Sequence, residues 1–242
     1  MELSFEDFRK RALDKKLSKW EKIGFPDEYR ENVELAIFED IKRKLNLSDH
    51  SNLRLLDIGC GCGDLVKHFI ELAKSHNHDL ILVDSEEMLS NIDVEFESPR
   101  IQLVPGYFPA ISSIDKMSAS LDYIVIYSVI QYVFLEQSLY KFLHKCIDLL
   151  KPGGKLLIGD IPNASSRNRF LKSEAGQRFL EVGKTNKNHI SIEHIDDERI
   201  DDSVIMAILS RFRQFGCETY LLPQSEGLPF DNRREDILIV KR

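Results

Sequence analysis

Short apolar runs alternate with helical patterns along most of this chain. Each run ends at a polar residue or a breaker, which is typical of buried parallel strands. Between the runs, apolar residues recur three and four positions apart, most regularly over residues 139–150, and this spacing predicts amphipathic helices. The predicted strands are residues 53–59, 79–84, 100–106, 121–129 and 155–161.

The alternation of strand and helix predicts an α/β, doubly wound parallel sheet with helices on both faces. Residues 217–224 and 235–242 read as two closing strands. Residues 51–242 are therefore assigned to one domain. Residues 1–50 are assigned to an N-terminal helical cap of two amphipathic helices.

Composition and charge narrow the class of protein. The 242 residues are 43% hydrophobic and 30% charged, with a formal net charge of −7. This balance favours a cytoplasmic globular protein and argues against a broad basic surface for nucleic acid or for a membrane. The amino terminus is charged throughout, and no apolar run is long enough to span a bilayer.

The most informative stretch is the glycine turn that follows the first predicted strand, LLDIGCGCGDL. A dinucleotide-binding turn places pyrophosphate against its backbone, and the carboxylates of Asp57 and Asp64 would repel that group. The same turn suits a ligand with an amino-acid end, because an ammonium group is attracted to a carboxylate. The ligand's own carboxylate is then expected on backbone N–H groups of the turn and of the helix start.

At these residues the chain resembles the class I S-adenosylmethionine-dependent methyltransferases, of the small-molecule type. The resemblance rests on the Asp57 turn, on Asp84 after the second strand, and on the segments LDYIVIYSVIQYV and LKPGGKLLIGDIP. It implies a mostly parallel seven-stranded sheet with an antiparallel last strand. It also implies that S-adenosyl-L-methionine is the cofactor.

The resemblance implies which residues contact that cofactor. A carboxylate accepts two hydrogen bonds from a vicinal diol, so Asp84 is expected at the ribose. The family's Gly-Asp-Ala after the third strand is replaced here by Gly-Tyr-Phe, which leaves the adenine contacts open. The expected cofactor-binding residues are Asp57, Gly59, Cys60, Gly61, Gly63, Asp84, Ser85, Met88, Gly106, Tyr107, Phe108, Ser128 and Tyr132.

Cys60 and Cys62 form a C-x-C pair, but they fall where the turn must approach the ligand. We therefore expect structural thiols and no metal site. Trp20, Phe25 and Tyr29 of the cap are expected either to pack against the sheet or to close the pocket.

Residues 162–201 interrupt the alternation and are too long for a plain loop, so they are predicted to form a partly helical insertion. This segment contains an acid–base cluster with two readings, a solvated polar loop or the source of a general base. His194 is the candidate catalytic residue, because a histidine of ordinary pKa is largely neutral at pH 7. The cluster comprises His189, Glu193, His194 and Asp196.

The expected activity is methyl transfer to a small molecule, at a hydroxyl of a sugar or other biosynthetic metabolite. The absence of an Asn-Pro-Pro-Tyr motif argues against a nucleobase acceptor. A protein or RNA methyltransferase and a non-catalytic cofactor-binding module remain alternatives. The partners expected are the acceptor and, as one option, a second copy of the chain in a homodimer. Four arginines, Arg167, Arg169, Arg233 and Arg234, are candidates for a phosphate or carboxylate on the acceptor.

Overall fold

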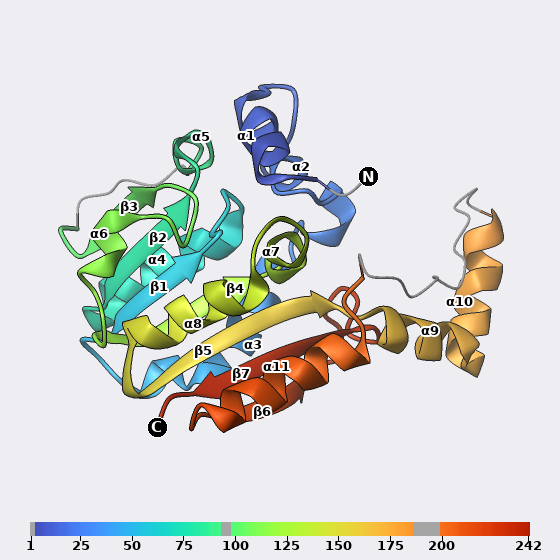
Figure 1. Ribbon diagram of the computed structural model, residues 1–242. Coiled ribbons are helices and arrows are strands. Elements are labelled where there is room, and N and C mark those ends of the chain that lie inside the picture. The colour runs from blue at the N-terminus through green and yellow to red at the C-terminus, as the bar shows by residue number, and fades with distance from the viewer. Residues whose placement is uncertain (1–2, 93–97, 186–198) are drawn as a thin grey trace.

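The computed structural model describes residues 3–92, 98–185 and 199–242, and it contains a seven-stranded sheet (Figure 1). The strand order is β3-β2-β1-β4-β5-β7-β6. Strands β1 to β5 run parallel, and β7 is antiparallel to both of its neighbours. The predicted fold class is therefore confirmed. The strands are β1 (Arg54–Ile58), β2 (Asp79–Asp84), β3 (Ile101–Pro105), β4 (Leu121–Tyr127), β5 (Leu150–Pro162), β6 (Glu218–Pro223) and β7 (Arg234–Val240).

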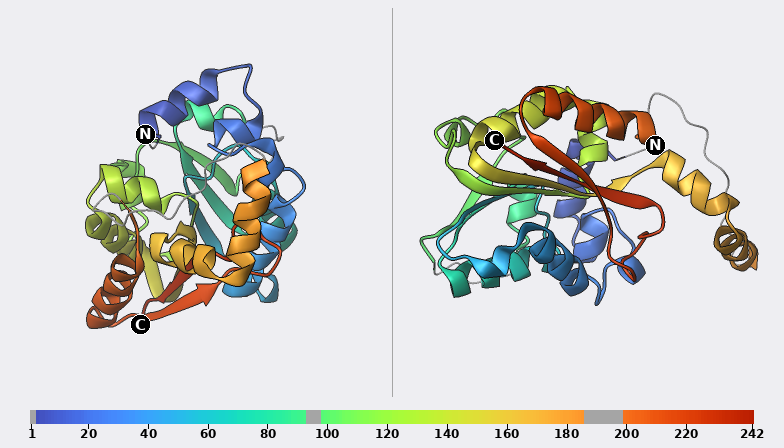
Figure 2. Two further views of the ribbon diagram at one scale, coloured as in Figure 1. Left: turned by 90° about the vertical axis from the view of Figure 1, so that its right-hand side faces the viewer. Right: turned by 90° about the horizontal axis from the view of Figure 1, so that it is seen from below.

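Helices cover both faces of the sheet, as Figure 2 shows in its right-hand view. One face packs against α3, α4 and α5, and the other packs against α8 and α11. The helices are α1 (Phe5–Leu13), α2 (Lys19–Lys22), α3 (Glu34–Leu45), α4 (Asp64–His76), α5 (Glu86–Leu89), α6 (Ser112–Asp115), α7 (Ile130–Glu136), α8 (Leu139–Leu149), α9 (Ala164–Lys172), α10 (Glu174–Thr185) and α11 (Asp202–Gln214). No helix in the described ranges is both long and apolar enough to cross a membrane.

The alternation along each strand explains the two layers. Successive side chains of a strand point to opposite faces. In β1, Leu55 accordingly joins the cluster under α3 and α4, whereas Leu56 joins the cluster under α8 and α11. Both residues are almost completely buried, as expected for a strand covered on both sides.

The structure differs most from the sequence prediction at the start of β5 and in the cap. Strand β5 begins at Leu150, because this residue pairs with Leu121 before a register shift carries the strand to Lys155. The cap contains more than the two expected helices: α2 and a short 3₁₀ turn (Asp27–Tyr29) stand between α1 and α3. Ser4 and Ser18 begin α1 and α2 as capping boxes.

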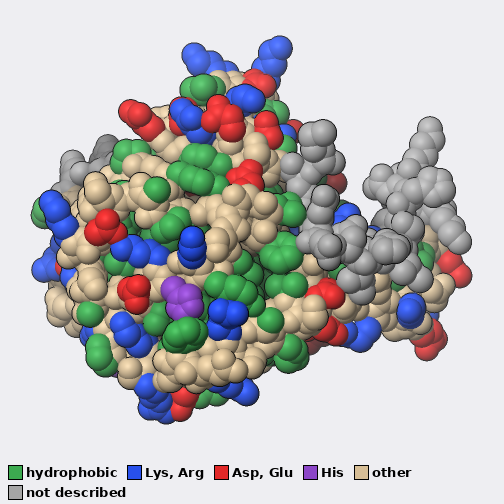
Figure 3. Space-filling model, in the orientation of Figure 1, with side chains coloured by type: hydrophobic (Ala, Val, Ile, Leu, Met, Phe, Trp, Pro, Cys, Tyr) green, Lys and Arg blue, Asp and Glu red, His purple; other side chains and the backbone are tan. Residues whose placement is uncertain are grey.

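Helices α1 and α2 of the cap lie above the carboxyl ends of the central strands, whereas α3 packs on one face of the sheet (Figure 1). Helix α1 packs on α5, where the Arg9 guanidinium bonds both carboxylate oxygens of Glu87 at 3.0 and 2.5 Å. The outer surface over α1 and α2 carries charged side chains of both signs (Figure 3). Helices α9 and α10 belong to the inserted segment and follow the carboxyl end of β5.

Candidate functional site

A cavity of about 1050 Å³ opens at the carboxyl ends of β1, β2 and β4, where the strand order reverses. Open α/β sheets bind their ligands at such a switch point. The expected cofactor residues that line this cavity are Asp57, Gly59, Cys60, Gly61, Gly63, Asp84, Met88, Gly106, Tyr107, Phe108, Ser128 and Tyr132. Ser85 is not among the lining residues. It is buried as the N-cap of α5, where its hydroxyl accepts a hydrogen bond from the Met88 backbone N–H at 3.1 Å.

The glycine turn leaves no room for side chains. Gly59 and Gly61 have φ values of +74° and +65°, a region that favours glycine. A Cβ at Gly59 would lie 2.6 Å from Val129, and one at Gly61 would lie 2.8 Å from Ile23 of the cap. The turn therefore needs glycine partly because the cap and the start of α7 close down on it.

Two carboxylates face this cavity without a cationic partner among the described residues. Burial and then the charge of Asp84 raise the pKa of Asp57 to about 8. Burial likewise raises the pKa of Asp84 to about 6, although the N–H groups of Gly61 (2.9 Å) and Ser85 (2.7 Å) donate to its two oxygens. Such a pair is costly to ionise in the empty protein and favours a cationic ligand.

The N-terminus of α4 is already occupied by a side chain. The carboxylate of Glu34 accepts hydrogen bonds from the backbone N–H groups of Asp64 and Leu65, the latter at 3.1 Å. Trp20 Nε1 donates to the same carboxylate at 3.3 Å. Glu34 therefore occupies the N–H groups of Asp64 and Leu65 at this helix start, and the expected contact of a ligand carboxylate with the backbone of the turn and the helix start stays a prediction.

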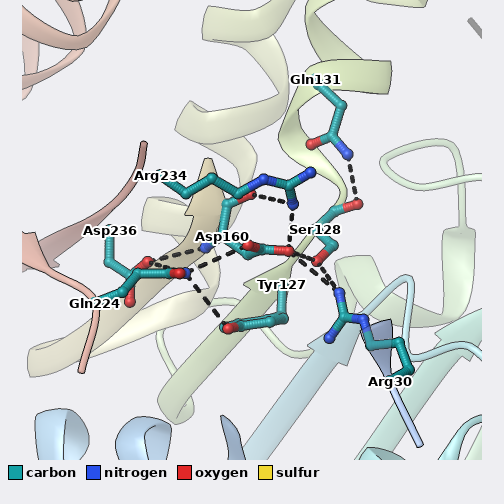
Figure 4. A network of polar contacts seen from close by, with 8 residues as sticks. All are labelled: Arg30, Tyr127, Ser128, Gln131, Asp160, Gln224, Arg234 and Asp236. Carbon is teal, nitrogen blue, oxygen red and sulfur yellow. Dashed lines mark hydrogen bonds and ion pairs between the residues drawn. The ribbon is translucent and has the colours of Figure 1, made fainter. Parts of the chain in front are cut away.

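Arg30 is a positively charged residue that lines the cavity, and Figure 4 shows its polar contacts. Its guanidinium donates to Ser128 Oγ at 2.7 Å and to Asp160 Oδ2 at 3.2 Å, and it stacks 3.9 Å from the ring centroid of Phe25. The side chain is 5% exposed. Arg30 is thus held in one orientation at the cavity wall.

Asp160 is the centre of this polar network (Figure 4). Its carboxylate accepts hydrogen bonds from Arg30, from the Ser128 hydroxyl and, at 2.6 Å, from Arg234. Its φ is +58°, at an irregularity of β5 where the pairing with β7 shifts register. Ser128 is also left-handed, at +59°. Strained residues at strand ends are typical of functional sites.

A second layer of the network supports Asp160 from β4, β7 and the loop before β7. Gln224 Nε2 lies 3.4 Å from Asp160 Oδ1, 3.3 Å from Asp236 Oδ1 and 3.5 Å from the Tyr127 hydroxyl. Asp236 forms an ion pair with Lys44 of α3 at 2.6 Å. These contacts fix the carboxyl end of β5 against α3 and β7.

Aromatic residues of the cap cover the cavity mouth. The rings of Phe5 and Tyr107 lie 4.5 Å apart, and those of Phe8 and Tyr132 lie 4.9 Å apart. Glu136 joins the two sides, because it accepts hydrogen bonds from the Phe5 backbone N–H (3.1 Å) and the Tyr107 hydroxyl (3.1 Å). The cap therefore covers part of the mouth of the cavity.

The three aromatic residues considered from the sequence have different places. Phe25 lines the cavity. Trp20 bonds Glu34, and Tyr29 packs 5.0 Å from Phe230, so neither of them lines it. Of the expected arginines, Arg169 forms an ion pair with Asp202, whereas Arg167, Arg233 and Arg234 line a second cavity.

The acid–base cluster of His189, Glu193, His194 and Asp196 lies outside the described residues. The four cysteines are buried free thiols, and the described residues include no group of three or more His, Cys, Asp or Glu side chains placed to hold a metal ion.

Sequence reasoning missed Arg30, Glu34, Glu136 and Asp160. Asp160 carried a usable signal, because it is a charged residue at the carboxyl end of a central strand. The other three belong to helical or loop segments whose pattern does not distinguish them from surface residues.

Comparison with known proteins agrees with this geometry. Residues 56–156 match a protein family described as a methyltransferase domain. No curated protein matches the chain.

Solved structures share the fold at low sequence identity. The plantazolicin methyltransferase BpumL, in complex with a monoazolic desmethylPZN analog and SAH, is 12% identical with a TM-score of 0.61, covering 98% of this chain and 97% of that one. An Aquifex aeolicus SAM-dependent methyltransferase is 13% identical with a TM-score of 0.56, covering 92% and 96%. A chain from a complex with the Haloferax volcanii Trm112 methyltransferase activator is 14% identical with a TM-score of 0.57, covering 97% of each. Residues 56–156 thus match a methyltransferase domain, and the seven-stranded sheet that contains them has the fold of these solved methyltransferases.

Proposed function

We propose that the cavity at the carboxyl ends of β1, β2 and β4 binds S-adenosylmethionine and that the chain methylates a hydroxyl of a small molecule, a sugar or another biosynthetic metabolite. The observation that carries the cofactor assignment is the buried pair Asp57 and Asp84, which faces the cavity with raised pKa values and no cationic partner among the described residues. A cationic ligand with a diol satisfies both carboxylates.

The described residues suggest how the ligand is oriented. Asp84 retains free lone pairs beside its two backbone bonds, so it suits the ribose hydroxyls. Asp57 lies on the neighbouring strand and suits the ammonium group. Because Glu34 fills the helix start, Arg30 is the residue we assign to the ligand's carboxylate.

The bound cofactor supplies an activated methyl group, so the protein mainly has to align the acceptor and exclude water. Phe5 and Phe8 of α1 close the mouth of the cavity. The buried Arg30–Asp160 pair holds Ser128 and the start of α7 in a fixed position beside it. A hydroxyl acceptor must also lose its proton, and we assign that step to His194 of the insertion.

The small-molecule assignment is supported by the net charge of −7 and by the aromatic residues of α1 that cover part of the mouth. It is also supported by analogy, because the solved plantazolicin methyltransferase holds a monoazolic desmethylPZN analog together with SAH on the same fold. A protein or RNA acceptor would require an extended groove, and methyl incorporation into protein or RNA from labelled cofactor would overturn the small-molecule assignment.

Calorimetric titration of the full chain with S-adenosylhomocysteine tests the cofactor assignment. Binding should be saturable, and Asp84→Ala should weaken it by about 1–3 kcal/mol because the ribose hydroxyls lose their acceptor. Asp79→Ala is the matched control, since Asp79 lies at the opposite end of β2 in a surface ion pair with Arg100. Binding of NADH without any response to S-adenosylhomocysteine would contradict the proposal.

A further inference from the structure

Four carboxylates line the first cavity in the described ranges, and Glu136 is the one that neither the ribose nor the ammonium group of the cofactor requires. Asp84 and Asp57 suit those two groups, and Glu34 accepts hydrogen bonds from backbone N–H groups at the start of α4. Glu136 is the last residue of α7, at an exposed position of the cavity wall. Its carboxylate is therefore accessible to a bound ligand.

The position of Glu136 is unfavourable for a carboxylate by local rules. The carboxyl end of a helix carries partial negative charge and favours a cation. The last turn of α7 has no basic residue, and no ion pair joins Glu136 to a cation of the described ranges. Its partners are neutral: the Phe5 backbone N–H lies 3.1 and 3.2 Å from its two oxygens, and the Tyr107 hydroxyl lies 3.1 Å from one of them. Departures from local preference are expected at functional sites.

The expected orientation of the cofactor brings its base toward this carboxylate. The base and the amino-acid arm leave the ribose on opposite sides, from C1′ and C5′. With the diol at Asp84 and the arm toward Asp57 on β1, the base extends toward β3, the other neighbour of β2. The loop after β3 lies there, because the Gly106 N–H donates to the backbone oxygen of Asp84 at 2.9 Å. Tyr107 of this loop is the residue that donates to Glu136.

Glu136 can accept a further hydrogen bond. A carboxylate offers about four lone-pair sites, and the contacts with Phe5 and Tyr107 use three of them. The loop after β3 supplies no carboxylate of its own at the lining positions Gly106, Tyr107 and Phe108. Glu136 therefore contributes the free anionic acceptor at this end of the described cavity. The donor that adenine presents outside its ring is the amino group at position 6.

We propose that the Glu136 carboxylate accepts a hydrogen bond from the 6-amino group of the cofactor's adenine and thereby makes the cavity selective for a 6-aminopurine. This inference rests on the proposed function, because it takes the ribose to lie at Asp84. A purine with an oxygen at position 6 presents an acceptor to the carboxylate, and two facing acceptors repel each other. A site built to receive an N–H group rejects the analogue that lacks it.

Calorimetry of the full chain with two ligands tests this assignment. S-inosylhomocysteine carries an oxygen in place of the 6-amino group of S-adenosylhomocysteine, and the two compounds share their sugar and their amino-acid arm. We expect the parent chain to bind the adenosyl compound at least about tenfold more tightly, the scale of one hydrogen bond to a charged group. Glu136→Gln should lower this ratio of dissociation constants about tenfold, because the amide can donate to the 6-oxygen.

Two further variants separate recognition of the base from a structural effect. Glu136→Ala can neither accept nor donate, so it should bring the ratio close to one. Glu87→Gln is the matched control, because Glu87 holds α1 through Arg9 and is not among the described lining residues. Its loss loosens the helix that Glu136 also contacts, so both affinities should change by the same factor and the ratio should stay that of the parent chain.

The same titrations separate this inference from the proposed function. Equal affinities of the parent chain for the two compounds would overturn the role of Glu136, as would an unchanged ratio in both Glu136 variants. In either case, saturable binding of S-adenosylhomocysteine leaves the cofactor site standing. Binding of neither compound by the parent chain would instead overturn the proposed cofactor site and, with it, this inference.

Discussion

Arg30 and Asp160, 130 residues apart in the sequence, form an ion pair of 3.2 Å in which the two side chains are 5% and 4% exposed. The pair ties the N-terminal cap to the carboxyl end of β5. Arg30 lines the first cavity, and Asp160 also binds Arg234, which lines the second. Buried charges of this kind are stable only while each keeps its partner. Asp160 therefore connects the cap, through Arg30, to the second cavity, through Arg234.

Asp160→Asn should destabilise the protein. It removes the carboxylate that Arg30 and Arg234 share, and leaving buried cations unpaired costs about 3–5 kcal/mol. Denaturant unfolding measures the change. The control is Asp115→Asn, whose surface pair with Lys145 is expected to contribute less than about 1 kcal/mol. Equal denaturation midpoints for the two variants would contradict the proposed contribution of the Asp160 ion pairs to stability.

Asp57→Asn should stabilise the empty protein at neutral pH while it weakens cofactor binding. The pKa of Asp57 is raised to about 8 in the folded state, so its contribution to stability is full at low pH and is lost as pH rises toward 8. The amide cannot ionise, so the variant should be more stable than the parent by about 1–3 kcal/mol at pH 8. Thermal unfolding at pH 4 and pH 8 measures the difference, which should be larger at pH 8. A variant that is less stable at pH 8 than the parent would refute this account.

Cofactor binding should release protons and should weaken as pH falls. The carboxylates of Asp84 and Asp57, with pKa values near 6 and 8, must ionise to meet a cationic ligand. Between pH 7 and pH 5 the affinity for S-adenosylhomocysteine should fall by about tenfold per pH unit for each protonated group, since one pKa unit is about 1.36 kcal/mol. Calorimetric titration in two buffers of different ionisation enthalpy gives the number of protons released on binding. Proton uptake on binding would contradict the predicted proton release.

Gly61→Val should abolish cofactor binding without unfolding the sheet. The backbone at Gly61 is left-handed, and a Cβ there would lie 2.8 Å from Ile23, so the cap must shift and open the cavity. Gly216→Val is the control for backbone strain alone, because its φ is +80° and no atom lies within 4 Å of its Cβ position. Calorimetry should show binding by the Gly216 variant and none by the Gly61 variant, while circular dichroism reports folding for both.

His194→Ala should reduce turnover by about 10² to 10⁴-fold while S-adenosylhomocysteine binds as before, which is the range for loss of a general base. The measurement needs a methyl acceptor, and small hydroxylated metabolites such as sugars are the first class to assay. His50→Ala, at an exposed position beside the start of the sheet, is the matched control. Unchanged turnover in the His194 variant would assign the cluster in the insertion to a solvated polar loop.

The sequence by itself determined the sheet and the residues of the cofactor cavity that lie on it. Short apolar runs and three-to-four-residue periods reflect which positions are buried, and burial against neighbours is what makes a strand or a helix stable. The glycine turn and Asp84 were predictable because parallel strands all end at one edge, so chemistry at strand ends converges there.

Only the tertiary structure decided which residues close that cavity and which donors remain free in it. Glu34 at the start of α4, Arg30 on Asp160 and the four arginines of the second cavity are brought together from segments far apart in the chain. An isolated charged residue on a helix or loop has the same local pattern whether it faces solvent or a buried partner. Its role is set by the three-dimensional packing that removes water around it and supplies the opposite charge.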